Sequence, residues 1–286
     1  MTEVRLASPA KVNLFLRVLS RDSDGFHGIE TLFCRLALAD DVVVEARGEA
    51  GSVTLDTAGA DLGPAEDNLA VRAARLVLTA TGRKFGVHIT LTKRIPVRAG
   101  LGGGSSNAAT VLRAVNLLAG KAVPSHELLQ MATRLGSDVP FFASEAPLAV
   151  AWNRGERMLR LPPLPAAPAL LLIPPVSVGT AEAYGWVDAA HQQGFGRGAL
   201  ALDLDALSTW GDIGRMAGNE FESVVFGRHP EIRAGYEALA RTHPLVCRMS
   251  GSGSALFAVY RTVGERDDAG MTLPGKLGLK IATEAG

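Results

Sequence analysis

The sequence predicts an α+β protein with two domains. Its 286 residues, 47% of them hydrophobic, are enough to bury a sizeable core. Strand patterns and helix patterns mix in both halves of the chain and do not alternate strictly, which is typical of the α+β class. A run with four prolines at residues 162–168 interrupts both patterns. We therefore expect domains at residues 1–162 and 163–286.

The first domain is expected to contain several strands and three helices. In residues 85–91, Val87, Ile89 and Leu91 alternate with polar residues, which is the pattern of a strand with one buried face. The expected strands are residues 11–19, 42–45, 52–56 and 85–91, with a hairpin at 149–153 and 158–161, and the expected helices follow Asn68, Ser105 and Ser125.

The second domain has the same mixed character. Its helices are expected after Thr180, Ala217 and Pro230, and its strands at residues 169–173, 246–249, 255–260 and 277–281. Nothing in this half repeats the first half, so a duplicated architecture is not expected.

Charge and cysteine content narrow the class of protein. The 29 basic and 29 acidic residues cancel, and no basic run with aromatic residues is present, so nucleic acid is not an expected partner. Cys34 and Cys247 lie far apart without metal-ligand spacing, which predicts free thiols in a reducing compartment. No apolar stretch reaches membrane-spanning length, and no secretory leader is evident. The sequence therefore predicts a cytoplasmic protein without a membrane partner.

The most informative segment is a glycine-rich loop at residues 96–109. Four glycines and two serines precede a helical pattern in which Val111, Leu112 and Val115 recur, and Gly120 supplies a stop. Glycines allow backbone N–H groups to converge on an anion, and the positive end of a helix favours phosphate. The residues expected to bind the phosphates are Pro96, Val97, Arg98, Ala99, Gly100, Leu101, Gly102, Gly103, Gly104, Ser105 and Ser106.

Two other kinds of glycine loop do not fit this segment. A P-loop needs Gly-Lys followed by Ser or Thr, but the Gly-Lys pairs of this chain precede Ala122 and Leu277. A dinucleotide fingerprint needs a third glycine or alanine where this chain has Ser105. A tight turn without a ligand remains the alternative to a phosphate site.

Two polar positions outside the loop are candidates for chemistry. Lys11 and Asn13 fall on one face of the expected first strand, where they can hold a phosphate or hydroxyl, or form a solvated edge. Asp138 lies in a tight connection after Gly136, as a general base or as a helix cap.

Two further turns carry weaker signals. Residues 24–27 read Asp-Gly-Phe-His, so Phe26 and His27 either bind a base or simply flank a hairpin turn. Residues 249–254 form a second small-residue loop, which together with the first suggests a phosphate site with two sides.

Residues 8–14, 96–109 and 249–253 occur in the order of the three motifs of the GHMP small-molecule kinase superfamily, which this chain resembles over nearly its whole length. Within the superfamily, residues 24–27, 101–109 and 136–140 are similar to the kinases that act on 4-diphosphocytidyl-2-C-methyl-D-erythritol. Mevalonate, homoserine and galactose kinases usually have a shorter Gly-Leu-Gly-Ser-Ser loop.

The resemblance implies a fold and a reaction. The N-terminal domain would be similar to ribosomal protein S5 domain 2, and the C-terminal domain would be ferredoxin-like. The reaction would be the ATP-dependent phosphorylation of the 2-hydroxyl of the cytidine diphosphate substrate, a step of the non-mevalonate route to isoprenoid precursors. Mg²⁺ would bridge ATP oxygens, with Ser105 or Ser106 as its candidate protein ligand.

The resemblance also implies roles for individual residues. Lys11 and Asp138 would be catalytic, and Asn13 would help to place the substrate. His27 would hydrogen-bond cytosine, Phe26 would stack on it where the family often has Tyr, and Tyr184 would be the opposing aromatic.

Two rival interpretations remain. Another GHMP kinase would share Lys11, the loop and Asp138 but would lack the cytidine pocket formed by Phe26, His27 and Tyr184. A catalytically silent sensor of this fold would be expected to lack the lysine or the aspartate, and both are present.

Overall fold

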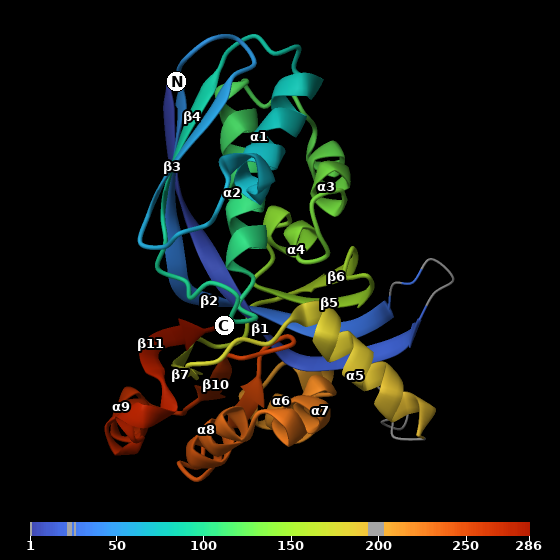
Figure 1. The fold of residues 1–286 in the computed structure, drawn as a ribbon, viewed down its shortest axis with the longest axis vertical. Helices are drawn as coiled ribbons and strands as arrows, with labels where there is room; N and C mark the ends of the chain where they lie inside the picture. Colours follow the sequence, from blue (N-terminus) through green and yellow to red (C-terminus); the bar gives the residue numbers. More distant parts are fainter. Residues whose placement is uncertain (1, 22–24, 26, 194–202) are drawn as a thin grey trace. The chain divides into compact units, whose positions relative to one another are not determined.

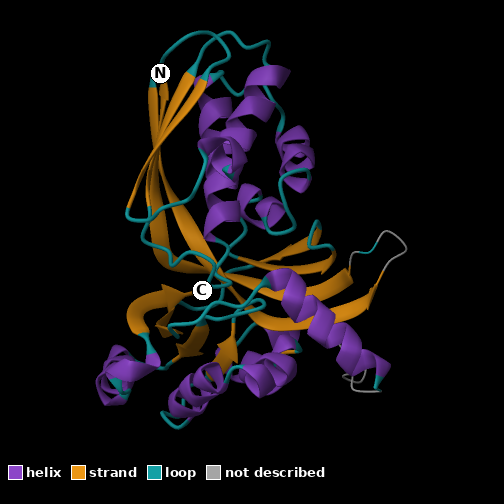
Figure 2. Cartoon of the chain, viewed as in Figure 1, coloured by secondary structure: helices purple, strands orange, loops and turns teal. Residues whose placement is uncertain are grey.

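The computed structural model describes residues 2–21, 25, 27–193 and 203–286, and Figures 1 and 2 show its elements. The chain forms two compact units. Unit 1 comprises residues 1–10, 38–97 and 102–146, and unit 2 comprises residues 11–37, 98–101 and 147–286. Strands β1 (Glu3–Arg21) and β2 (His27–Ala46) each contribute residues to both units. The domain boundary expected after residue 162 stays a prediction.

Unit 1 is a sheet covered by helices. β3 (Val53–Ala58) is parallel to β4 (Val87–Thr92), and α1 (Leu69–Ala80) connects them. Residues 41–46 of β2 pair with β4 in the antiparallel direction. Figure 1 shows α1 and α2 (Gly103–Leu118) against one face of these strands. The unit is completed by α3 (Ser125–Thr133) and α4 (Val139–Ala143).

The burial pattern of unit 1 explains why these segments fold as they do. In β4, Val87, Ile89 and Leu91 are buried, whereas the residues between them are half-buried, as the alternation predicted. The Asn68 side chain caps α1 by accepting a hydrogen bond from the backbone N–H of Ala70 at 2.9 Å. The alternation and the cap together explain why β4 and α1 form where they do.

Unit 2 contains the ferredoxin-like arrangement expected for the second half. Its sheet has the order β11 (Leu279–Ala285), β7 (Ala167–Ile173), β10 (Leu256–Val259), β9 (Val246–Met249), and every pair is antiparallel. The chain passes from β7 through helices to β9 and β10, and then through α9 (Val263–Thr272) to β11. This connectivity is a βαββαβ unit.

The remaining elements of unit 2 surround that sheet. β5 (Leu148–Asn153) forms a hairpin with β6 (Arg157–Leu161) and pairs with residues 29–34 of β2. Two-residue β8 (Gly218–Asn219) pairs with β1 in parallel. The helices between β7 and β9 are α5 (Thr180–Gln192), α6 (Trp210–Met216), α7 (Phe221–Arg228) and α8 (Pro230–Ala240).

Most of the expected elements are confirmed, and the differences have physical causes. β2 begins at residue 27, whereas the expected strand began at residue 42. The prediction missed the first part of β2 because consecutive residues from Leu32 to Cys34 are fully buried, so this part lacks the alternation of a half-exposed strand. The helix expected after Ala217 begins only at Phe221, after β8. The elements α4, α6, β8 and α9 were not predicted. α4 and β8 are too short to show a periodic pattern, and α9 buries only Ala269, so its apolar periodicity is weak.

The two cysteines are free thiols, as expected. Cys34 is fully buried, and burial raises the pKa of its thiol to about 12. Cys34 is therefore an uncharged core residue at neutral pH. Over the described ranges, the structure contains no helix long and apolar enough to cross a membrane.

Truncating a core leucine tests the core of unit 1. Leu91 is 1% exposed, whereas Leu279 on β11 is 60% exposed. We expect Leu91→Ala to lower the free energy of unfolding by about 2–5 kcal/mol, because it removes buried methyl groups and leaves a cavity. Leu279→Ala is the matched control and should change it by no more than about 0.5 kcal/mol. Urea denaturation followed by circular dichroism measures both; equal losses would contradict the assigned core.

Candidate active site

Lys11 and Asn13 form a buried polar pair on β1. Lys11 is only 3% exposed and Asn13 only 2% exposed. The Lys11 Nζ donates hydrogen bonds to Asn13 Oδ1 at 2.7 Å and to the carbonyl oxygen of Gly100 at 3.1 Å. The predicted shared face is confirmed, and burial excludes the alternative of a solvated edge. A buried ammonium needs such partners, because burial without them is costly.

The surroundings of this pair hold Asn13 in one orientation. The Asn13 Nδ2 donates to Thr31 Oγ1 at 2.8 Å, and that hydroxyl donates to the carbonyl oxygen of Phe15 at 2.7 Å. The Lys11 Nζ also lies 5.5 Å from the centroid of the Phe33 ring, within the range of a cation–π contact. The Asn13 carbonyl oxygen is therefore directed toward the lysine.

The first part of the glycine loop contacts the second small-residue loop within unit 2. The Ser250 Oγ donates to the carbonyl oxygen of Gly100 at 2.9 Å, and the backbone N–H of Ala255 donates to the carbonyl oxygen of Ala99 at 3.0 Å. Gly100 has φ of +79°, and a Cβ there would lie 2.2 Å from the carbonyl oxygen of Ser250. Glycine is required at this position both by its conformation and by the lack of space.

Asn219 supports the second loop and was not identified from the sequence. Its Nδ2 donates to the carbonyl oxygens of Met249 and Gly251 at 2.8 and 2.7 Å, and its Oδ1 accepts from the backbone N–H of Phe221 at 3.0 Å. The available signal was the Gly-Asn pair that separates Ala217 from the helical pattern. From the sequence alone, a Gly-Asn pair is typical of a turn and gives no reason to single out Asn219.

The second part of the glycine loop is the start of α2 in unit 1. Gly102 is in the left-handed conformation, with φ of +71°, and precedes the first helical residue. The backbone N–H of Ser106 donates to the carbonyl oxygen of Gly102 at 2.9 Å, which closes the first turn. The N–H groups of residues 103–105 lie too early in the helix for an intrahelical acceptor and form the positive end of its dipole. Strand, glycine loop and helix occur in the predicted order.

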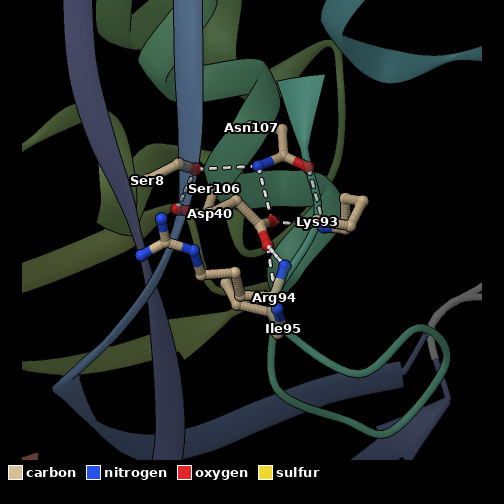
Figure 3. Close-up of polar contacts among 7 residues, drawn as sticks. All are labelled: Ser8, Asp40, Lys93, Arg94, Ile95, Ser106 and Asn107. Carbon is tan, nitrogen blue, oxygen red and sulfur yellow. Dashed lines mark hydrogen bonds and ion pairs between the residues drawn. The ribbon is translucent and has the colours of Figure 1, made fainter. Parts of the chain in front are cut away.

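A buried network anchors this helix start (Figure 3). Asp40 is fully buried and forms an ion pair with Lys93. Asp40 also accepts hydrogen bonds from the backbone N–H groups of Arg94 and Ile95, at 2.7 and 2.8 Å, and thereby holds the chain between β4 and the glycine loop.

Asn107 connects Asp40 to the first turn of α2. Its Nδ2 donates to Asp40 Oδ2 and to Ser8 Oγ, both at 2.9 Å, and its Oδ1 accepts from Lys93 Nζ at 3.0 Å. The Ser8 Oγ donates to Ser106 Oγ at 2.8 Å. Asp40 and Lys93 were not identified from the sequence, because partners 53 residues apart leave no periodic signal.

Asp138 directly precedes the short helix α4 in unit 1. It is half-buried, and its side chain makes no capping hydrogen bond to that helix. The structure therefore does not show Asp138 as a side-chain cap of α4. Its catalytic role stays a prediction.

His27 and Tyr184 contact each other in unit 2. Their rings stack with centroids 4.9 Å apart and an interplanar angle of 21°, and Tyr184 meets the Phe221 ring edge-on at 5.0 Å. The Nε2 of His27 is hydrogen-bonded to Asp188 Oδ1 at 2.6 Å. Phe26 lies outside the described residues. Asp188 was missed, although its i,i+4 spacing from Tyr184 places both on one face of α5.

Comparison with known proteins identifies the class to which this fold and these loops belong. The family described as "GHMP kinases N terminal domain" matches residues 68–145, and "GHMP kinases C terminal" matches residues 202–270. A homoserine kinase from Cytophaga hutchinsonii has the same fold, with a TM-score of 0.73 at 18% identity, over 100% of this chain and 95% of that chain. The protein is thus a GHMP kinase by fold.

More similar relatives define the family within that class. The 4-diphosphocytidyl-2-C-methyl-D-erythritol kinase of Solibacter usitatus is 40% identical over 90% of this chain and 81% of its own. That of Symbiobacterium thermophilum is 40% identical over 92% of each. A crystal structure of 4-(cytidine 5'-diphospho)-2C-methyl-D-erythritol kinase has a TM-score of 0.82 at 36% identity, over 99% of both chains. The chain belongs to the 4-diphosphocytidyl-2-C-methyl-D-erythritol kinase family.

Adding a methyl group at Gly100 tests the contact between the two loops. We expect Gly100→Ala to lower the free energy of unfolding by about 1–3 kcal/mol, because the new Cβ would meet the Ser250 backbone in a strained conformation. Gly227→Ala in α7 is the matched control, because its Cβ would meet no atom within 4 Å. The control should be neutral or stabilising by up to about 1 kcal/mol. Thermal denaturation of both variants distinguishes a required glycine from a replaceable one.

Proposed function

We propose that this protein transfers the γ-phosphoryl group of ATP to the 2-hydroxyl of 4-diphosphocytidyl-2-C-methyl-D-erythritol, in the non-mevalonate pathway of isoprenoid precursor biosynthesis. The observation that carries the proposal is the buried Lys11–Asn13 pair beside Gly100, in a chain of this kinase family. A lysine held without exposure to water is suited to a phosphate ligand, since its charge is not screened.

In this proposal, the residues from Pro96 to Ser106 bind the ATP phosphates. The N–H groups at the start of α2 supply donors, and the helix dipole favours the negative charge. Phosphoryl transfer requires little covalent chemistry from a protein, so positioning and charge stabilisation dominate. Within unit 2 the Ser250 hydroxyl holds the carbonyl oxygen of Gly100, and within unit 1 Asp40 holds the backbone N–H of Arg94, which precedes the loop. Each of these contacts restrains the backbone in its own unit.

Lys11 and Asp138 are the proposed catalytic residues. The substrate oxygen forms a bond to the γ-phosphorus, the bond between that phosphorus and the ADP oxygen breaks, and the hydroxyl proton passes to the Asp138 carboxylate. Lys11 stabilises the negative charge on the transferred group. Asn13 would place the substrate near that ammonium. Accepting a proton late in the transfer is compatible with an aspartate of ordinary acidity.

Mg²⁺ is the proposed metal ion, and its role is to neutralise the ATP phosphates. Within the described parts of the chain, no group of three or more His, Cys, Asp or Glu side chains could hold a metal ion. Mg²⁺ does not need such a cage, because it retains several waters and binds largely through phosphate oxygens. Ser105 is the better candidate protein ligand, because the Ser106 hydroxyl is buried and hydrogen-bonded to Ser8.

The proposed cytidine pocket contains Phe26, His27 and Tyr184. The His27 imidazole at the start of β2 and the Tyr184 ring on α5 match a base that offers both polar edges and a face for stacking. We also propose that the protein acts in the cytoplasm, where nucleotide co-substrates are available.

A substrate panel tests the proposed function. ATP consumption with Mg²⁺ should occur with 4-diphosphocytidyl-2-C-methyl-D-erythritol and not with mevalonate, homoserine, galactose or free methylerythritol. Detecting ADP and the phosphorylated product by mass spectrometry excludes uncoupled ATP hydrolysis. Turnover of one of the other alcohols would retain the kinase class and reject the cytidine pocket. No turnover with any of them would favour a silent sensor.

Replacing Asp138 tests its role separately from ATP binding. We expect Asp138→Ala to lower kcat by at least about 100-fold, which is the usual contribution of general base catalysis, while ATP affinity changes by no more than a few-fold. The control is Glu127→Ala on neighbouring α3, where the carboxylate is 55% exposed. Steady-state kinetics and calorimetric titration of ATP give both quantities. Parallel losses of turnover and ATP affinity would contradict a catalytic role.

A further inference from the structure

Helix α5 carries three side chains with a common orientation. Tyr184, Asp188 and His191 are spaced i, i+4 and i+7 along the helix, so they lie on one face. Tyr184 stacks on the His27 ring, and Asp188 is hydrogen-bonded to His27 Nε2 at 2.6 Å. His191 makes a similar contact with Glu220, also at 2.6 Å. One helix face thus both stacks on His27 and hydrogen-bonds it.

The contact with Asp188 determines which nitrogen of the imidazole carries hydrogen. An ionised carboxylate can only accept hydrogen bonds, so Nε2 must be the donor. In the neutral ring, the other nitrogen, Nδ1, is then an acceptor. The His27 side chain is 8% exposed and that of Asp188 is 29% exposed, and stacking on Tyr184 restricts rotation of the ring. The neutral His27 ring is therefore held in one orientation and one tautomer.

This tautomer distinguishes cytosine from uracil, the two pyrimidines of ribonucleotides. Cytosine has an amino group at position 4, which donates hydrogen bonds, whereas uracil has a carbonyl oxygen there, which accepts them. An Nδ1 that accepts matches the amino group. The same nitrogen would face the uracil carbonyl as one acceptor against another, which leaves both without a hydrogen bond.

We propose that Asp188 is a positioning residue that makes His27 selective for cytosine over uracil. The inference rests on the proposed function, because it assumes that His27 faces the base of the substrate. It adds that specificity for the base depends on the hydrogen bond between His27 and Asp188, a residue that need not touch the substrate. A site with a polar group arranged for one partner rejects a mismatched analogue by leaving that group unpaired.

The experiment compares the cytidine diphosphate substrate with its uridine diphosphate analogue. The quantity measured is the ratio of kcat/KM for the two substrates in the wild type, Asp188→Asn and Asp188→Ala. An asparagine amide can donate as well as accept, and alanine can do neither. In both variants the His27 ring is therefore no longer restricted to the tautomer with hydrogen on Nε2. We expect the cytidine-to-uridine ratio to fall at least about tenfold in both variants. KM for ATP should stay within about twofold, because α5 contributes no residue to the proposed ATP loop.

A second pair on the same helix provides the control. His191→Ala removes the contact of α5 with Glu220 but removes neither the Asp188 nor the Tyr184 contact of His27. If Asp188 acted only by holding the helix in place, this variant would change the ratio as much as the Asp188 variants do. We expect it to leave the ratio unchanged.

Nitrogen-15 NMR of the His27 ring in the wild type supplies a measurement that needs no variant. The expected spectrum shows hydrogen on Nε2 and a bare Nδ1. Hydrogen on Nδ1 alone would overturn the proposal, as would an unchanged ratio in Asp188 variants that still phosphorylate the cytidine substrate. Failure of the wild type to phosphorylate that substrate at all would instead reject the proposed function, and this inference with it.

Discussion

The ammonium group of Lys11 is a buried charge, and it is stabilised by Asn13, the carbonyl oxygen of Gly100 and the Phe33 ring. Removing one partner of a buried charge typically costs about 3–5 kcal/mol, so its neighbours are constrained in turn. The Asn13 oxygen must point to it, which requires the Thr31 hydroxyl on the other side of the amide. The carbonyl oxygen of Gly100 also accepts from it, at a residue whose left-handed backbone only glycine adopts readily. One buried charge thus connects the amide, the hydroxyl and the glycine.

Unit 1 contains a second buried charge with a different purpose. Asp40 is fully buried, and its partners include a lysine, an amide and two backbone N–H groups. Such a network rigidifies a structure only when every member is satisfied. Through Asn107 and Ser8 it reaches the first turn of α2, and through Arg94 and Ile95 it reaches the chain that enters the glycine loop (Figure 3). The backbone donors at this helix start are therefore preorganised before any phosphate arrives.

Helix α5 illustrates how specificity can depend on residues behind the binding group. A histidine alone can donate or accept at either nitrogen, and so it is a poor reader of a base. The carboxylate of Asp188 removes that ambiguity, and stacking on Tyr184 removes rotational freedom. The resulting imidazole presents one defined hydrogen-bonding edge.

Local patterns in the sequence were sufficient for β4, the glycine loop and α2, because alternation, glycine content and helical spacing act over a few residues. The ferredoxin-like arrangement was expected only from the family resemblance, since the pattern of α9 is too weak to predict that helix. Local patterns also placed Lys11 and Asn13 on one face, since side chains two positions apart in a strand point to the same side. Only the tertiary structure decided that this face is buried, that Gly100 lies against Ser250, and that Asp40 and Asp188 have distant partners. Those contacts join residues 53 to 161 positions apart, and a pairing at that separation leaves no periodic trace in the chain.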